Sequence, residues 1–163
     1  MNGKVLVAGI GNIFLGDDAF GVEVVHRLEQ RGLPQHVVVK DFGIRSYDLA
    51  YSLMQDWDLV VLVDALTRGG KPGTLYTMEP ELLPGETAAN IDAHSMNPVA
   101  ALQLVNALGG KVGRLLVVGC EPGSVDPSQH GDFGLSHVNH AVAGAIEIIE
   151  SLVARVRSQA SAA

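Results

Sequence analysis

The stretch KVLVAGI, residues 4–10, decides the fold class together with the residues that follow it. It is short and apolar and it is followed by glycine at position 11, a pattern that favours a strand buried on both faces. From Asp18 onward the apolar residues recur at helical spacing, until Gly32 and Pro34 end the pattern. The chain therefore opens with a strand, a loop and a helix, as α/β proteins do.

The alternation of strands and helices continues along the chain. The segment between the third and fourth expected strands is too short for a crossover helix, because a parallel neighbour needs about a dozen connecting residues. We therefore expect an α/β sandwich in which the fourth strand runs antiparallel to a mostly parallel sheet. The remaining expected strands span residues 37–42, 59–64, 74–78 and 114–119, and the remaining expected helices span 47–55, 97–108 and a segment that begins at Ser136.

Size and composition limit the classes of function. With 163 residues, 47% of them hydrophobic and 18% charged, the chain fits a single domain over residues 1–163, with a disordered tail from about residue 158. The formal net charge of −7 argues against a nucleic-acid partner. No apolar run reaches the roughly 18 residues of a membrane helix, so no membrane partner is expected. A lone cysteine and the absence of a signal-peptide pattern predict a cytoplasmic location.

Unusual polar residues follow three of the expected parallel strands. In an open α/β sheet, ligands bind beyond the carboxyl ends of parallel strands. Carboxylates crowded at one edge repel each other unless a cation joins them, and a divalent metal is the simplest partner. The sequence therefore predicts a metal site at this edge. The polar residues are Asn12, Asp17 and Asp18 after the first strand, Asp64 at the end of the third, and Cys120, Glu121 and Asp126 after the last.

Asp18, Asp64 and His94 are the candidate ligands. Each has an ordinary alternative, because an aspartate at a helix start caps backbone amides, an aspartate after a strand fits a turn, and a loop histidine bonds to backbone. Two carboxylates and an imidazole from separate loops nevertheless form an open site suited to nickel, zinc or a similar cation. Spacing alone does not choose between these metals.

The other polar candidates have less support. Cys120 follows a buried strand with no base beside it in the sequence, so it is interpreted as a small core residue and not as a nucleophile. His137 and His140 surround the start of the last helix and fit its solvated face, and His130 precedes them. No nucleophile is assigned, and Asp17 is the candidate general base.

The stretch GIGNIFLGDDAFG, residues 9–21, closely resembles the opening motif of the hydrogenase maturation proteases. Three further pieces follow in the order that the family shows. Val63-Asp64-Ala65 resembles the second acidic motif, Ala93-His94 falls at the histidine position, and Gly119-Cys120-Glu121-Pro122 resembles the turn after the last strand. The resemblance covers nearly the whole chain, and the shared order of the pieces supports it more than any single piece.

The resemblance implies a three-layer α/β/α sandwich around a mixed five-stranded sheet with one antiparallel strand. It implies an endopeptidase that removes a C-terminal peptide from the precursor of a nickel-iron hydrogenase large subunit after nickel insertion. The metal-contacting positions of the family correspond to Asp18, Asp64 and His94, with nickel supplied by the substrate and no permanent organic cofactor. Asn12, Arg45 and His94 flank the expected edge and are predicted to contact the substrate.

Two other classes compete with this interpretation. A nucleotide-binding α/β domain without protease activity is suggested by glycines 9 and 11 after a strand, but Phe14 occupies the position of the third fingerprint glycine. The acidic loop would also repel a pyrophosphate. Peptidyl-tRNA hydrolases likewise begin with a strand and a Gly-x-Gly-Asn turn, but Ile13-Phe14 replaces the Pro-Gly that they carry there, and the net charge opposes tRNA binding.

Overall fold

The structure is a computed structural model, and it describes residues 3–80, 98–126 and 137–161. Strands alternate with helices through most of the chain, as the sequence predicts. The elements in chain order are β1 (Val5–Ile10), the 3₁₀ helix η1 (Gly16–Ala19), α1 (Phe20–Glu29), β2 (Val37–Gly43), α2 (Ser46–Leu53), β3 (Leu59–Ala65), β4 (Leu75–Met78), α3 (Pro98–Ala107), β5 (Leu115–Cys120) and α4 (Ala141–Ser161).

The five strands form one mixed sheet in the order β2-β1-β3-β5-β4. β1 pairs in parallel with both β2 and β3, β3 pairs in parallel with β5, and β4 runs antiparallel to β5. The prediction of a mostly parallel sheet with an antiparallel fourth strand is therefore confirmed. The order places β1 and β3 side by side, so the loops that follow them leave the sheet at the same edge.

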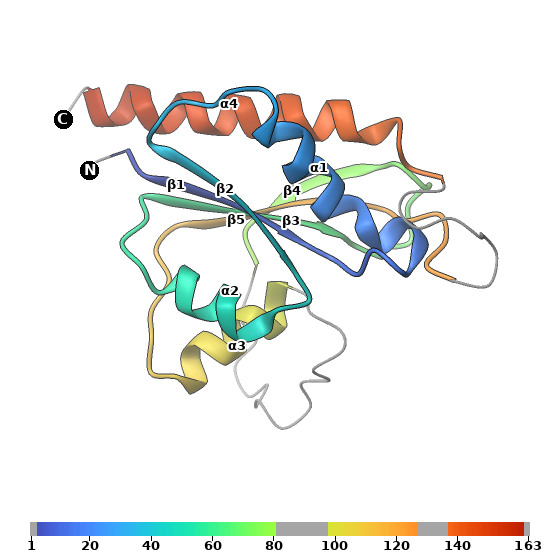
Figure 1. Ribbon diagram of the computed structural model, residues 1–163, viewed down its shortest axis with the longest axis horizontal. Helices are drawn as coiled ribbons and strands as arrows, with labels where there is room; N and C mark the ends of the chain where they lie inside the picture. Colours follow the sequence, from blue (N-terminus) through green and yellow to red (C-terminus); the bar gives the residue numbers. More distant parts are fainter. Residues whose placement is uncertain (1–2, 81–97, 127–136, 162–163) are drawn as a thin grey trace.

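The three inner strands are apolar along their length because they are covered on both faces. β1 and β5 are buried at every residue, and β3 at all but its last. Helices α1 and α4 cover one face of the sheet and α2 and α3 cover the other, as Figure 1 shows. Alternate strand residues enter the two layers, which is the packing expected of parallel strands between helices. The predicted three-layer α/β/α sandwich is confirmed.

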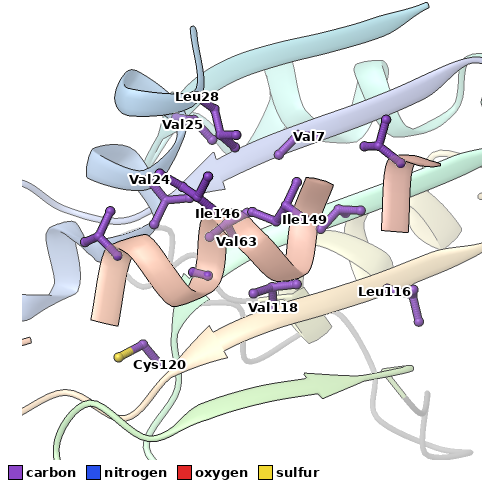
Figure 2. Packing of buried hydrophobic residues seen from close by; sticks show 14 of the residues in the cluster. Val7, Val24, Val25, Leu28, Val63, Leu116, Val118, Cys120, Ile146 and Ile149 are labelled. Carbon is purple, nitrogen blue, oxygen red and sulfur yellow. The ribbon is translucent and has the colours of Figure 1, made fainter. Parts of the chain in front are cut away.

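The larger of the two cores lies between the sheet and helices α1 and α4. Figure 2 shows Val7 and Val63 of the sheet facing Val24 of α1 and Ile146 and Ile149 of α4. All of these side chains are buried. Burial of each such side chain stabilises the fold by roughly 1.5–3 kcal/mol before conformational entropy is subtracted. This core holds α1 against the strands that carry the candidate ligands.

Glycine lets α1 approach the central strands unusually closely. A Cβ atom added to Gly21 would lie 2.0 Å from the Val63 carbonyl oxygen and 2.3 Å from that of Ile10. A Cβ atom added to Gly11, whose φ is +148°, would lie 2.0 Å from the Asp18 carbonyl oxygen. Only glycine fits such backbone contacts. The glycines of the motif thus seat η1 and α1 directly on the ends of β1 and β3.

The last helix differs from the sequence-based prediction at both ends. α4 begins at Ala141, five residues after the predicted start at Ser136, which itself lies outside the described residues. A turn precedes the helix, and in it the Ala141 N–H donates to the Val138 carbonyl at 2.9 Å. The helix continues through Ser161, so the tail predicted to be disordered from about residue 158 is helical in its first part. Among the described helices, none is long and apolar enough to cross a membrane.

Candidate metal centre and substrate cleft

Asp18 and Asp64 lie at the carboxyl ends of neighbouring strands. Gly9 of β1 pairs with Val63 of β3, so the loop containing Asp18 and the end of β3 at Asp64 meet at one edge of the sheet. Asp64 is 2% exposed, and its Oδ1 accepts a hydrogen bond from the Ala65 N–H at 2.8 Å. Asp18 is half-buried, and its Oδ2 accepts from the Asn12 N–H at 2.8 Å. The fold therefore brings together the two carboxylates that the sequence singled out.

The two carboxylates oppose each other electrostatically. Burial raises the pKa of Asp64 well above its usual range, and the negative charge of Asp18 raises it further. Burial also raises the pKa of Asp18, although the Asn12 hydrogen bond partly offsets this effect. A buried pair of like charges is stabilised by a proton or by a cation. The pair therefore has the chemistry of part of a cation site; the carboxylates alone do not select a metal, and an imidazole ligand would be needed to favour nickel or zinc.

The third predicted ligand, His94, lies outside the described residues. Within residues 3–80, 98–126 and 137–161, no three His, Cys, Asp or Glu side chains form a group that could hold a metal ion. The described part of the chain thus supplies two carboxylates, and the assignment of His94 as ligand and substrate contact stays a prediction.

Asp17 is fully buried next to the candidate ligand Asp18. Its Oδ2 accepts hydrogen bonds from the N–H groups of Gly123 at 2.8 Å and Ser124 at 3.1 Å, and its Oδ1 accepts from the His137 N–H at 3.0 Å. The Asp17 N–H in turn donates to the Ser124 carbonyl at 2.8 Å. These contacts give Asp17 an anchoring role that joins η1 to the segments after β5 and before α4. Its role as a general base stays a prediction.

Glu121 performs a similar function for the loop between β3 and β4. Its carboxylate accepts hydrogen bonds from the Arg68 N–H at 2.8 Å, the Gly69 N–H at 3.2 Å and the Tyr76 hydroxyl at 2.8 Å. The Arg68 N–H is the largest cause that lowers the pKa of Glu121, and the same carboxylate raises the pKa of Tyr76. Sequence reasoning found Glu121 but not Tyr76, because only the antiparallel placement of β4 brings that tyrosine to the end of β5.

Cys120 is a buried thiol and not an activated one. Burial, together with the nearby charge of Asp17, raises its pKa to about 11. The reactive form of cysteine is the thiolate, which is scarce at neutral pH when the pKa is this high. The interpretation of Cys120 as a core residue is confirmed, since its side chain packs in the core shown in Figure 2.

The histidines before α4 are exposed. His137 Nδ1 lies 3.6 Å from the Asp17 carboxylate, at the outer side of the anchoring contact. His140 is also exposed, near Gly73. Both positions agree with the predicted solvated face. His130 lies outside the described residues, and Asp126 is an exposed turn residue whose N–H donates to the Ser124 hydroxyl at 3.3 Å.

A cleft of about 410 Å³ opens between the segment that follows β1 and the end of β2. Asn12 connects the cleft with the candidate ligands, because its N–H donates to the Asp18 carboxylate and the residue lines the cleft. Arg45 forms the other side, where its guanidinium donates to the carbonyls of Asp41 and Phe42 at the end of β2. The sequence-predicted residues Asn12 and Arg45 thus share one cleft. Its exposed apolar residues, which sequence reasoning missed as a set, are Ile13, Phe14 and Ile44.

The fold and the site define an α/β protein with two neighbouring carboxylates at the carboxyl ends of its central strands. A family model described as hydrogenase maturation protease matches residues 22–152. The chain belongs to the hydrogenase maturation protease family and is an endopeptidase.

Individual relatives support this assignment over most of their length. The chain is 36% identical over 147 residues to a putative hydrogenase maturation protease of Methanocaldococcus jannaschii, covering 89% of this chain and 93% of the relative. It is 32% identical over 126 residues to the hydrogenase 2 maturation protease of Escherichia coli, covering 76% of each. A solved hydrogenase maturating endopeptidase of E. coli has a TM-score of 0.73 at 29% identity, covering 93% of both chains. The nucleotide-binding and peptidyl-tRNA hydrolase alternatives are therefore wrong.

Proposed function

We propose that this endopeptidase removes the C-terminal extension of a nickel-iron hydrogenase large-subunit precursor once nickel has been inserted. The observation that carries the proposal is the pair formed by Asp18 and Asp64. Asp64 is buried and Asp18 is half-buried, the pair is unfavourable when both carboxylates are charged, and Asn12, which bonds to Asp18, lines a neighbouring cleft of about 410 Å³. A cation brought by the substrate would remove the conflict.

The two carboxylates would coordinate the nickel of the precursor, with His94 as the third ligand. A cation at the site would lower the raised pKa of Asp64, because a nearby positive charge favours the ionised form. A precursor without nickel offers no such gain, so its extension is held less firmly against the enzyme. Recognition of this kind supplies specificity through positioning of the scissile bond. The nickel belongs to the substrate, and the protein needs no organic cofactor of its own.

The neighbouring cleft would hold the polypeptide next to the nickel-bearing residues. Asn12 links the two regions, and Arg45 supplies a fixed cation at the far side. Exposed Ile13, Phe14 and Ile44 offer apolar contacts for substrate side chains. We place the reaction in the cytoplasm, where the single thiol of Cys120 would stay reduced.

The test uses full-length large-subunit precursor prepared with and without nickel. Wild type should shorten the nickel-loaded precursor, measured by intact mass, and leave the nickel-free precursor intact. Asp18→Asn, Asp64→Asn and His94→Ala should each slow processing by at least about a hundredfold, because loss of a hydrogen-bonding partner of a metal ligand already costs about 10–100-fold. Asp56→Asn, an exposed aspartate remote from β3's carboxyl end, is the matched control and should process normally.

Two outcomes would refute the proposal. Cleavage of nickel-free precursor at the wild-type rate would remove the recognition role of the metal. Processing by Asp64→Asn at the rate of the Asp56→Asn control would remove the carboxylate pair from the site. Isothermal titration of each variant with nickel alone shows separately whether the pair binds the cation.

A further inference from the structure

β2 forms one edge of the sheet and pairs only with β1. The Val5 N–H donates to the His36 carbonyl at 3.0 Å, and a parallel ladder repeats every two residues. The backbone groups of Val38 and Lys40 therefore face β1, and the N–H and C=O of Val39 and the N–H of Asp41 face outward. The outward backbone of residues 37–41 is called the β2 edge below.

Among the residues that the structure describes, no strand pairs with the β2 edge. Proteins commonly protect such edges with proline, bulges, very short strands or lysine side chains, because free N–H and C=O groups pair readily with another chain, and of these devices the open part of β2 carries only Lys40. β2 has seven residues and no proline, and its one irregularity lies between Asp41 and Gly43, at its carboxyl end. There the Arg45 guanidinium donates a hydrogen bond to the Asp41 carbonyl. At the other end of the edge the Val37 N–H donates to the Pro34 carbonyl at 2.9 Å, so the open part of the edge runs from Val39 to the N–H of Asp41.

The β2 edge leads into the cleft. Asp41 and Gly43 line the cleft together with Asn12, whose N–H binds the Asp18 carboxylate. An extended segment that pairs along the edge therefore arrives at the cleft, on the side of the sheet where Asn12 bonds to Asp18. Free backbone donors and acceptors in strand register select an extended polypeptide, since no other ligand class presents the same alternating groups.

The charges along the edge select the kind of polypeptide. The chain as a whole carries −7, but Lys40 is exposed on β2, with its Nζ 4.8 Å from the Phe42 ring, and Arg45 follows. The Asp41 carboxylate is already paired, 3.0 Å from His26 Nε2. The exposed ammonium of Lys40 is the positive charge within the β2 edge, and it complements an acidic side chain on the incoming strand.

We propose that the β2 edge binds an extended segment of the precursor beside its cleavage site as a sixth strand, with an acidic side chain near Lys40. The inference rests on the proposed function and adds a mode of substrate binding to it. Main-chain hydrogen bonds along the edge give affinity, and the cleft selects the side chains that follow.

Proline substitution tests the edge with a matched control on the opposite side of the sheet. Val39→Pro removes an outward N–H without removing a bond to β1. Thr77→Pro does the same on β4, because the Glu121 N–H donates to the Thr74 carbonyl and so directs the Thr77 backbone outward. Val39→Ala controls for the side chain. Val39→Pro should raise the KM for nickel-loaded precursor about tenfold with kcat nearly unchanged, as expected for one or two lost hydrogen bonds.

The controls Thr77→Pro and Val39→Ala should stay within about twofold of wild type, a margin below one net hydrogen bond. An equal KM for Val39→Pro and Thr77→Pro would overturn the proposal. Lys40→Glu should likewise raise KM, whereas exposed Lys111→Glu should not. Equal effects of these two charge reversals would overturn the acidic character of the segment.

Hydrogen exchange tests binding at the β2 edge on the wild-type enzyme, so the result does not depend on whether a variant folds. Bound precursor should slow exchange of the Val39 and Asp41 amides but not of the Thr77 amide, and unchanged Val39 exchange in the bound complex would overturn the proposal. Binding with this protection but without cleavage would contradict the proposed function alone. Sedimentation that shows a wild-type dimer lost in Val39→Pro would assign the edge to a second copy of the chain and overturn the proposal.

Discussion

At Asp64, burial and the neighbouring charge of Asp18 both disfavour the ionised form of the side chain. Its pKa is raised in the folded protein, so the folded state keeps a proton that the unfolded state loses above its ordinary pKa near 4. The stability of the metal-free protein should therefore fall as pH rises from about 4 through the folded pKa of Asp64. This pH dependence of stability is opposite to that of a carboxylate in an ion pair, whose pKa is lowered and whose contribution to stability increases as pH rises.

Asp64→Asn should stabilise the metal-free protein at pH 7 by roughly 1–3 kcal/mol, the usual cost of an uncompensated buried polar group. The amide oxygen can still accept from the Ala65 N–H, so the local backbone contact is kept. Urea unfolding at pH 5 and pH 7 measures the effect, which should shrink at the lower pH. A loss of stability at pH 7, with Asp56→Asn unchanged, would contradict the raised pKa.

Cys120 yields a prediction about what the enzyme does not use. Cys120→Ala should retain processing within about twofold and lose roughly 1 kcal/mol of stability, as small core truncations do. The native thiol should also resist iodoacetamide at pH 8, because its pKa is about 11. Rapid alkylation of the folded protein, or loss of processing in Cys120→Ala without loss of fold, would assign the thiol a chemical role.

Residue-level prediction succeeded where the fold class alone fixed the place of a side chain. Asp18 and Asp64 follow parallel strands, and parallel strands end at a common edge, so their proximity follows from order along the chain. The anchoring role of Asp17 does not follow in this way. It depends on backbone groups of Gly123 and His137, and no local pattern links those positions.

At the scale of elements, the contact between α1 and the ends of β1 and β3 positions the site. Gly21→Ala should cost about 2–3 kcal/mol, because its Cβ would meet the Val63 and Ile10 carbonyl oxygens and α1 would have to move outward. The shift would separate Asp18 from Asp64, so nickel affinity measured by titration should fall with it.

Gly144→Ala on α4 is the control for this substitution. Its Cβ would meet only the end of the Leu75 side chain, at 3.0 Å, and alanine favours a helix interior more than glycine does. It should be neutral or stabilising and leave nickel affinity unchanged. Equal loss of affinity in both variants would show that helix seating does not control the carboxylate pair.

Element prediction was accurate for the buried strands and less so for the last helix. The strands β1, β3 and β5 are apolar runs that agree with the observed bounds to within one residue. The start of α4 was predicted at Ser136 from a capping preference, but the helix begins at Ala141 after a turn. Capping signals in a loop rich in Ser, Asp and Gly do not single out one position.

At the scale of the whole molecule, the sheet joins two cores on opposite faces. Ile149 is fully buried in the core under α1 and α4, and Trp57 packs against the core under α2 and α3. Ile149→Ala should destabilise the protein by about 2–5 kcal/mol. If the domain unfolds in one step, the Trp57 fluorescence transition should shift as far as the circular dichroism transition.

Exposed Glu147→Ala on the same helix is the control and should shift neither transition beyond about 0.5 kcal/mol. Separate transitions for Trp57 and for the helices in Ile149→Ala would show that the two layers unfold independently. The layered architecture itself was predictable from the alternation of strands and helices, whereas the strand order came to light only in the structure, because local sequence does not specify which strands become neighbours.

The contacts of Asp17 also determine when, during synthesis of the chain, η1 can be held in its final position. The N-terminal loop that presents Asp18 is held by a bond to His137, 120 positions further along the chain. A ribosome-bound fragment that stops before β5 lacks that bond and lacks β5, one of the two strands that pair with β3. The full set of bonds that holds η1 in place therefore forms only after the chain has been made as far as His137.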